Sequence, residues 1–252
     1  MKRLVDIILS FLGLLLLSPL LAVVSFLIWK QDYHSPFYIA PRVGKNENIF
    51  KMVKLRSMVV NADKTEVDST SANDLRITRI GHFVRKFKLD EFTQLWNVLV
   101  GDMSLVGPRP NVKRETDLYT DIEKNLLRVK PGITDFSSIV FSDENDILKD
   151  CENPDISYNQ LIRPWKSRLG LLYIERQSLL LDFALLFLTL VALVSRDKAL
   201  EGVGKLLLRL NASAAVIRVS MRKDRLEPFP PPGSDRIVVS RQSICTTGQN
   251  TG

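Results

Sequence analysis

The sequence predicts an α+β protein with an N-terminal membrane helix, a small folded domain carrying amphipathic helices, and a short β-hairpin. Three observations support this prediction. The uncharged apolar run at residues 7–29 is long enough to cross a bilayer, residues 36–58 alternate short apolar stretches with turn residues, and later segments repeat apolar side chains at helical spacing. We place the boundaries at residues 1–33, 34–196 and 197–252, the last being a basic, partly disordered extension.

The composition narrows the class of protein. The 252 residues carry 35 Lys plus Arg against 28 Asp plus Glu, and 45% are hydrophobic, which excludes a disordered chain, a collagen and a coiled coil. A single long apolar run excludes a multi-span transporter. The chain has only two Cys and two His, so any bound metal is expected to be a hard cation held by carboxylates. We predict no nucleic-acid partner.

The apolar run contains a helix-breaking pair at its middle. A helix over residues 7–29 would be about 34 Å long, enough for a hydrocarbon core of about 30 Å. Ser18-Pro19 predicts a kink or break, and neither half would then span alone. Two forms stay open: a kinked span, and a re-entrant helix that turns at Ser18-Pro19 and leaves by the same face. A signal peptide is less favoured, because the apolar core is too long and no cleavage site follows it.

Local patterns predict the elements of the folded domain. Period-two alternation predicts a strand over 49–55 in a hairpin that turns at 43–46, and a polar stretch over 61–74 predicts an exposed loop. Thr78 is a candidate N-cap. The further expected elements, in order, are a helix over 78–88, a helix over 90–99 ended by Gly101, a rigid loop over 107–110 and a charged helix over 111–130.

Three expectations concern the C-terminal part. Residues 179–194 are apolar but short and carry Asp182, so they predict a buried or interfacial helix. Residues 199–222 form either a basic amphipathic helix on an anionic membrane or a solvated charged helix. From Pro228 onward the composition is typical of disorder. The positive charge of this tail favours the cytoplasmic side.

Asp90 and Glu91 form an acidic pair that opens a predicted helix. Acidic residues at a helix start commonly complement the macrodipole, and this bland interpretation suffices for the pair alone. The neighbourhood favours chemistry, because Arg85 lies five positions earlier and Arg109 follows. A carboxylate pair among guanidinium groups beside a membrane anchor suits phosphate chemistry: the carboxylates can hold Mg²⁺, one of them can attack phosphorus, and Arg binds phosphate oxygens.

Further cations are candidates for anion binding. Lys54 and Arg56 lie two apart on a predicted strand and so share one face, although a solvated strand face has the same pattern. In Pro108-Arg109-Pro110 the two prolines restrict the backbone around one cation, which lowers the entropy lost when it binds an anion. A simple rigid turn is the alternative. The sequence lacks a Gly-rich phosphate loop, a G-x-S-x-G motif and a zinc motif.

A set of segments between residues 2 and 194 carries a family resemblance. The segments are Lys2-Arg3-x-x-Asp6, Ser18-Pro19, Pro41-Arg42-Val43-Gly44, residues 50–58, Arg76-x-Thr78-x-x-Gly81-x-x-x-Arg85, residues 89–110 and Lys130-Pro131-Gly132-Ile133-Thr134. They resemble the bacterial sugar transferase family, the monotopic phosphoglycosyl transferases that act on polyprenol phosphate.

The resemblance implies a reaction in which a UDP-sugar gives its sugar phosphate to a membrane polyprenol phosphate, such as undecaprenyl phosphate, with release of UMP. It implies that Asp90 is the nucleophile, that Glu91 helps to bind Mg²⁺, and that Lys54, Arg85 and Arg109 bind phosphate and nucleotide. It also implies a re-entrant membrane helix, a catalytic domain over residues 34–196 on the cytoplasmic face of the inner membrane, and surface-polysaccharide synthesis.

The sequence departs from the family pattern at two places, and two other functions are alternative hypotheses. Residues 135–138 read Asp-Phe-Ser-Ser where many members have Gly and a Gln-containing stretch, which concerns sugar recognition, and Phe92-Thr93 replaces a Pro-containing pattern. A membrane-anchored scaffold protein whose enzyme site has lapsed is a second hypothesis. In a third, the C-terminal tail of an active enzyme docks a downstream glycosyltransferase.

Overall fold

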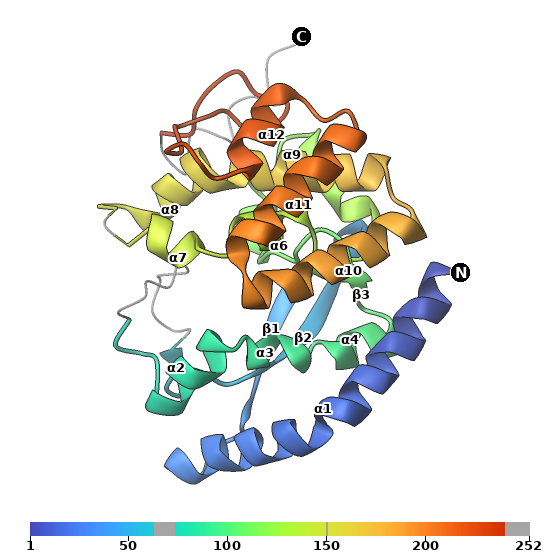
Figure 1. The fold of residues 1–252 in the computed structure, drawn as a ribbon. Coiled ribbons are helices and arrows are strands. Elements are labelled where there is room, and N and C mark those ends of the chain that lie inside the picture. The colour runs from blue at the N-terminus through green and yellow to red at the C-terminus, as the bar shows by residue number, and fades with distance from the viewer. Residues whose placement is uncertain (63–73, 150, 240–252) are drawn as a thin grey trace.

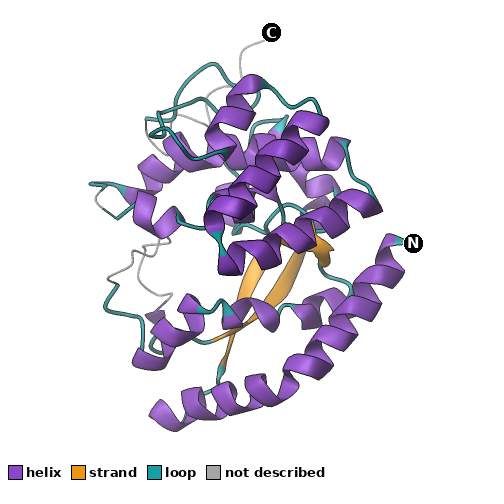
Figure 2. Cartoon of the chain, in the orientation of Figure 1, coloured by secondary structure: helices purple, strands orange, loops and turns teal. Residues whose placement is uncertain are grey.

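The computed structural model describes residues 1–62, 74–149 and 151–239, so most of the predicted 61–74 loop lies outside the described residues. The architecture is mixed α and β, as predicted, with two small two-stranded sheets among many helices. Helix α1 (Lys2–Asp32) runs along one side of the molecule, against the row formed by α2, α3 and α4 (Figure 1). The C-terminal helices gather at the other end, beyond the central hairpin (Figure 2).

Helix α1 is continuous through Pro19 and bends near its middle (Figure 1). Proline has no N–H, so it leaves the carbonyl of Leu15, four residues earlier, without its helical partner. The hydroxyl of Ser18 donates to that carbonyl at 2.8 Å. This bond replaces the backbone bond that is lost at Pro19 and keeps the helix continuous. The bend near the middle of α1 confirms the predicted kink. The structure does not show the expected helix hairpin, because α1 remains one bent helix.

The predicted hairpin is confirmed. Strands β1 (Phe37–Val43) and β2 (Ile49–Leu55) pair antiparallel, from Phe37 opposite Leu55 to Val43 opposite Ile49. The connection is a 3₁₀ turn, η1 (Lys45–Glu47). The outer edge of β2 is covered by Asn97, whose amide accepts from the N–H of Val53 at 2.9 Å and donates to the carbonyl of Lys51 at 2.7 Å. These bonds fix the hairpin against the helix row.

Short-range signals correctly place the start of the first helix after the hairpin and the end of the helix row. Helix α2 (Arg79–Lys86) begins with Thr78, whose hydroxyl accepts from the N–H of Gly81 at 2.9 Å, as predicted. The predicted helix over 90–99 is two short helices, α3 (Leu89–Phe92) and α4 (Leu95–Val100). Thr93 lies between them, and its hydroxyl donates to the carbonyl of Val53 in β2 at 3.0 Å. Gly101 ends α4 with a φ of 100°.

The prediction of a single charged helix over 111–130 is wrong. This region contains only α5 (Lys113–Thr116) and the 3₁₀ segment η3 (Glu123–Arg128), joined by turns. The structure also contains a pair of parallel strands that the sequence did not predict, β3 (Ser104–Val106) and β4 (Gly132–Thr134). A Cβ atom on Gly132 would lie 2.1 Å from the backbone nitrogen of Gly107, so glycine is needed for this close approach.

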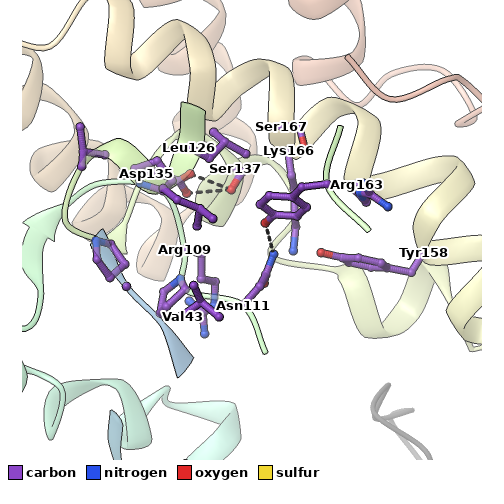
Figure 3. A pocket seen from close by; sticks show the side chains of 17 residues that line it. Val43, Arg109, Asn111, Leu126, Asp135, Ser137, Tyr158, Arg163, Lys166 and Ser167 are labelled. Carbon is purple, nitrogen blue, oxygen red and sulfur yellow. Dashed lines mark hydrogen bonds between the residues drawn. The ribbon is translucent and has the colours of Figure 1, made fainter. Parts of the chain in front are cut away.

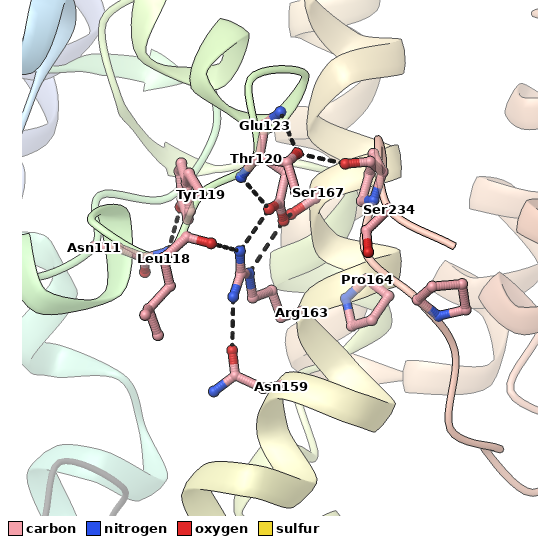
Figure 4. Close-up of polar contacts among 12 residues, drawn as sticks. Asn111, Leu118, Tyr119, Thr120, Glu123, Asn159, Arg163, Pro164, Ser167 and Ser234 are labelled. Atoms are coloured by element: carbon pink, nitrogen blue, oxygen red, sulfur yellow. Dashed lines mark hydrogen bonds and ion pairs between the residues drawn. The ribbon is translucent and has the colours of Figure 1, made fainter. Parts of the chain in front are cut away.

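The residues that hold η3 form a buried ionic network. Arg163 donates to both carboxylate oxygens of Glu123, at 3.1 and 2.5 Å, and to the amide oxygen of Asn159 at 2.9 Å (Figure 4). Ser167 donates to the same carboxylate at 2.7 Å. The two charged side chains are only 3% and 0% exposed. Charges this deeply buried need every one of these partners.

The remaining helices build most of the core. Their bounds are α6 (Phe136–Val140), α7 (Glu144–Ile147), α8 (Pro154–Ser157), the π-helical turn η4 (Tyr158–Ile162), α9 (Arg163–Glu175), α10 (Leu179–Val194), α11 (Arg196–Arg209) and α12 (Ala214–Ser220). Helix α10 buries Leu181 and Leu185 but leaves Phe187 and Leu190 65% and 64% exposed. It is therefore half-buried, with an apolar outer face.

The C-terminal extension packs on the domain. Helices α11 and α12 place Leu200, Val203, Leu207 and Val216 in the main core, where the sequence suggested a surface helix over 199–222. Beyond them the ring of Phe229 packs on Trp165, with ring centroids 4.6 Å apart. Residues 228–239, where disorder was expected, thus include contacts with α9; residues 240–252 lie outside the described part of the chain.

Candidate active site

The acidic pair lies on the four-residue helix α3, next to β2. Asp90 is largely buried, with its side chain 17% exposed, and one carboxylate oxygen lies 3.8 Å from the Nζ atom of Lys54. Lys88, the residue just before α3, has a φ of 51°, so the chain turns sharply before this helix begins. This turn, together with Thr93 bonded to β2, holds Asp90 against the strand that carries Lys54.

Glu91 contacts the predicted cation of the proline-flanked loop. The guanidinium of Arg109 donates to a Glu91 carboxylate oxygen at 2.8 Å. The loop itself is tied to β4, because the carbonyl of Pro108 accepts from the N–H of Gly132 at 3.0 Å. The tertiary structure therefore brings together Lys54, Asp90, Glu91 and Arg109, which the sequence separates by 55 positions.

Arg85 completes this group of charges from helix α2. Its Nε atom donates to the hydroxyl of Ser57 at 2.9 Å, and its charge acts on Asp90. In the part of the chain that the structure describes, the other nitrogen atoms of this guanidinium make no hydrogen bond, so they can bind another partner. Of the four predicted substrate-binding cations, Lys54, Arg85 and Arg109 surround the carboxylate pair.

The fourth predicted cation, Arg56, lies one residue beyond β2 and binds the end of α1. Its guanidinium donates to both carboxylate oxygens of Asp32, at 2.5 and 2.7 Å, and to the carbonyl of Ser35 at 2.8 Å. The side chain is 9% exposed. Arg56 lines a cavity, but its donors are taken up by these groups. The structure therefore gives Arg56 an anchoring position.

The two carboxylates have opposite pKa shifts. Burial raises the pKa of Asp90, and the negative charge of Glu91 adds to this, while Lys54, Arg109 and Arg85 partly oppose it. Burial also acts to raise the pKa of Glu91, but the charges of Arg109, Lys88 and Lys54 outweigh it and hold this pKa below its usual value. Neighbouring carboxyl groups with separated pKa values are typical of sites where the two have different roles.

Two cavities meet at this cluster. One has a volume of about 570 Å³ and extends to the C-terminal end of α1, with Phe37 and Tyr38 in its wall. The other, of about 450 Å³, extends towards α6 and α9, where it reaches Ser138 and Lys166. The residues that line both cavities are Arg42, Lys54, Arg85, Asp90 and Val112. Asp90 therefore faces two compartments.

A third, much smaller hollow of about 40 Å³ lies behind Arg109 (Figure 3). Asp135 lies in its wall, caps α6 through the N–H of Ser138 at 2.8 Å, and accepts from the hydroxyl of Ser137. A space of this size holds a water molecule or two and no substrate. The unusual 135–138 segment also reaches the larger cavity, because Ser137 and Ser138 line the 450 Å³ cavity.

Sequence reasoning did not identify the residues that hold the N-terminal end of α1. Lys2 pairs with Asp182 at 2.6 Å, and Asp6 accepts from the hydroxyl of Ser104 at 2.9 Å and from the N–H of Leu105 at 3.2 Å. The available signal was the spacing, because two opposite charges four residues apart lie on one face of a helix. A lone carboxylate within the apolar 179–194 run was a second signal.

The pH dependence of the site follows from the raised pKa of Asp90. The sequence resemblance predicts that Asp90 is the nucleophile, and a nucleophilic carboxylate has to be ionised, so kcat/KM is expected to fall as the pH drops through this pKa. Lys54→Met removes a cation that lowers the pKa of Asp90, so the acid limb of the pH–rate profile moves to higher pH. Lys51→Met, at an exposed position on the same strand, leaves the limb in place. A limb that stays or moves to lower pH in Lys54→Met contradicts this assignment.

Comparison with known proteins agrees with the sequence resemblance. A family model described as bacterial sugar transferase matches residues 1–196. The chain is similar to the UDP-galactose-lipid carrier transferase of Erwinia amylovora, with 35% identity over 216 residues that cover 79% of this chain and 41% of that protein. It is 35% identical over 193 residues to the UDP-glucose:undecaprenyl-phosphate glucose-1-phosphate transferase of Escherichia coli, covering 75% and 39%.

A shorter relative matches over most of its length. The exopolysaccharide production protein ExoY of Sinorhizobium fredii is 34% identical over 206 residues, which cover 76% of this chain and 84% of that protein. The chain thus spans less than half of the two longer relatives and most of this one. The family model covers well over half of the chain, including the whole charge cluster. The chain belongs to the bacterial sugar transferase family.

Proposed function

We propose that this chain is a phosphoglycosyl transferase that moves a sugar phosphate from a UDP-sugar to undecaprenyl phosphate or a similar polyprenol phosphate. The observation that carries the proposal is the position of Asp90 in the walls of two cavities. One cavity is lined by His34 and Ser35, just beyond the C-terminal end of the apolar helix, and suits a lipid phosphate. The other, with more polar groups in its wall, suits a nucleotide sugar. The names of the relatives support these two substrate classes.

The proposed chemistry has two displacement steps at one phosphorus atom. A carboxylate oxygen of Asp90 attacks the β-phosphorus of the UDP-sugar, the bond to the bridging oxygen breaks, and UMP leaves with the electron pair. An oxygen of the lipid phosphate then attacks the same phosphorus, and the bond to Asp90 breaks, which returns the carboxylate. A covalent step of this kind allows a soluble and a lipid substrate to react in turn. The surrounding Lys54, Arg85 and Arg109 stabilise the charge of the phosphoryl oxygens.

Asp90 and Glu91 also fit the expected Mg²⁺. Mg²⁺ is commonly held by one or two carboxylates together with substrate phosphates. Across residues 1–62, 74–149 and 151–239 no group of three or more His, Cys, Asp and Glu side chains could hold a metal, so an all-protein cage is absent there. The adjacent carboxylates match the simpler arrangement. When bound, Mg²⁺ would neutralise negative charge on the phosphate oxygens.

The contacts at the two ends of α1 support a re-entrant insertion. Among the described residues α1 is the one helix long and apolar enough to cross a membrane. Its first turns bind the folded domain through Lys2 and Asp6, and its last turn binds the same domain through Asp32 and Arg56. A helix whose polar ends both contact one water-exposed domain returns to the side it came from. The middle of α1 and the outer face of α10 would then lie in the lipid.

A cysteine-labelling experiment tests this topology. Single cysteines inserted after Met1 and substituted at Tyr33, in a chain lacking Cys151 and Cys245, are expected to react with an impermeant reagent from the cytoplasmic side only. A cysteine at Lys124, which is exposed on the folded domain, provides the reference. Labelling of the two positions from opposite sides would show a true span.

The alternative of a lapsed, scaffold-type protein has less support. It requires the loss of a residue on which the chemistry depends. Asp90, Glu91, Arg85 and Arg109 are all present and line the same 450 Å³ cavity. The deciding experiment is to measure UMP release from a panel of UDP-sugars by the full chain with polyprenol phosphate and Mg²⁺. If no UDP-sugar in the panel yields UMP, the result would favour the scaffold protein.

A further inference from the structure

One cation at the junction of the two cavities has no part in the chemistry described so far. Of the five residues that line both cavities, Lys54, Arg85 and Asp90 have assigned roles and Val112 is apolar. The fifth is Arg42. In the hairpin register Tyr38 lies opposite Lys54, and residues two apart on a strand share one face, so Arg42 projects from the same face as Lys54.

Within residues 1–62, 74–149 and 151–239, the guanidinium of Arg42 has no carboxylate partner. Its one hydrogen bond is to the carbonyl of the neighbouring Pro41, at 2.9 Å, and in the described part of the chain no carboxylate pairs with it. Two other cations of the site are engaged: Lys54 lies 3.8 Å from Asp90, and Arg109 binds Glu91. Arg42 therefore has donors to spare at the point where the cavities meet.

Holding this charge in place costs free energy. Burial lowers the pKa of Arg42; Tyr38 opposes this shift, and the positive charges of Arg109 and Arg114 add to it. Of the five residues that line both cavities, three are cations (Arg42, Lys54 and Arg85) and one, Asp90, is acidic, so the junction carries an excess of positive charge. A half-buried guanidinium without a carboxylate is stabilised when an anion binds, and phosphate accepts two parallel bonds from such a group.

We propose that Arg42 forms a phosphate subsite shared by the leaving nucleotide phosphate and the incoming lipid phosphate. The inference rests on the proposed function. In an in-line displacement the leaving group departs opposite the attacking atom. UMP therefore leaves on the side of phosphorus opposite Asp90, and the lipid phosphate, which displaces Asp90, has to approach from that same side. A cation that lines both cavities is placed to bind the two phosphates in succession.

The shared position makes a prediction for each half-reaction. In the first, Arg42 stabilises the negative charge that grows on the departing UMP. In the second, it orients the phosphate oxygen that attacks the phospho-sugar on Asp90. Loss of a hydrogen bond between charged groups is expected to slow each half-reaction about 10- to 100-fold.

The test uses the full chain with Arg42→Gln, Arg42→Lys and, as the matched control, Lys45→Gln in the exposed turn of the same hairpin. Three quantities are measured: UMP affinity by calorimetry, the single-turnover burst of UMP without acceptor, and transfer from the isolated phospho-sugar enzyme to polyprenol phosphate. Arg42→Gln should weaken UMP binding and slow both half-reactions, Arg42→Lys should lose less, and Lys45→Gln should match the unmodified chain.

The outcomes separate this inference from the proposed function. A loss confined to one half-reaction, or unchanged UMP affinity in Arg42→Gln at an unchanged unfolding temperature, overturns the shared subsite while the transferase activity stands. If the unmodified chain releases no UMP from any UDP-sugar but binds UMP through Arg42, the proposed function fails and the phosphate subsite is retained.

Discussion

Asp90→Asn is expected to abolish the covalent phospho-sugar adduct and to lower turnover on the order of 10³-fold or more, as is typical when a nucleophile is removed. The amide has nearly the size of the carboxylate but lacks the anionic oxygen that attacks phosphorus. Intact-mass spectrometry after mixing with UDP-sugar and Mg²⁺ should show the adduct in the unmodified chain and not in Asp90→Asn. UMP release gives the rate.

Two further variants make this result specific. Asp121→Asn removes a carboxylate whose side chain is 97% exposed and which lines no cavity described above, so its activity should be unchanged. Glu91→Gln should retain the nucleophile but release Arg109, and we expect an intermediate rate. Full turnover by Asp90→Asn would rule out an aspartyl intermediate at this position.

Arg163→Met is expected to destabilise the protein by about 3–5 kcal/mol, because it leaves the charge of Glu123 buried without its cation. Both side chains are almost fully buried, and Arg163 also donates to the carbonyl of Leu118 at 2.5 Å (Figure 4). For a domain of this size the loss corresponds to a fall in the unfolding temperature of roughly 6–20 °C. Thermal unfolding of the full chain in one detergent measures it.

An exposed ion pair a few residues away provides the control. Lys124 and Asp121 lie 2.9 Å apart, with side chains 52% and 97% exposed. Such pairs contribute less than about 1 kcal/mol, so Lys124→Met should barely change the unfolding temperature. Adding Glu123→Gln to Arg163→Met removes the orphaned charge and should recover part of the stability. Equal effects of Arg163→Met and Lys124→Met would contradict the assigned importance of burial.

The contacts of Arg56 show the limit of assigning roles by residue type. From the sequence, Arg56 and Lys54 look alike, because both are cations on or next to one strand. In the fold, Lys54 faces Asp90, whereas Arg56 forms a two-bond pair with Asp32 at the end of the apolar helix α1. Which anion a cation meets depends on how distant segments pack, and no local pattern contains that information.

The elements that the sequence predicted correctly are those with short-range causes. The strand over 49–55 follows from alternation of buried and exposed side chains, helix α2 from the capping hydroxyl of Thr78, and the kink of α1 from Pro19. The prediction of one helix over 111–130 was wrong for the opposite reason. The composition of this stretch suits a helix, but Glu123 is buried in a pair with Arg163, a contact between segments 40 positions apart.

By itself, the sequence determined the apolar helix, the hairpin and the carboxylate pair, because each rests on residues that are close together in the chain. It also determined the family, through motifs spread over residues 2–194. Only the tertiary structure decided that Arg109 meets Glu91, that Arg42 lines both cavities with Asp90, and that the extension after residue 196 packs into the core. These outcomes depend on contacts between segments tens of residues apart. Their free energies are set by burial and by the choice of charged partner, which exist only once the chain has folded.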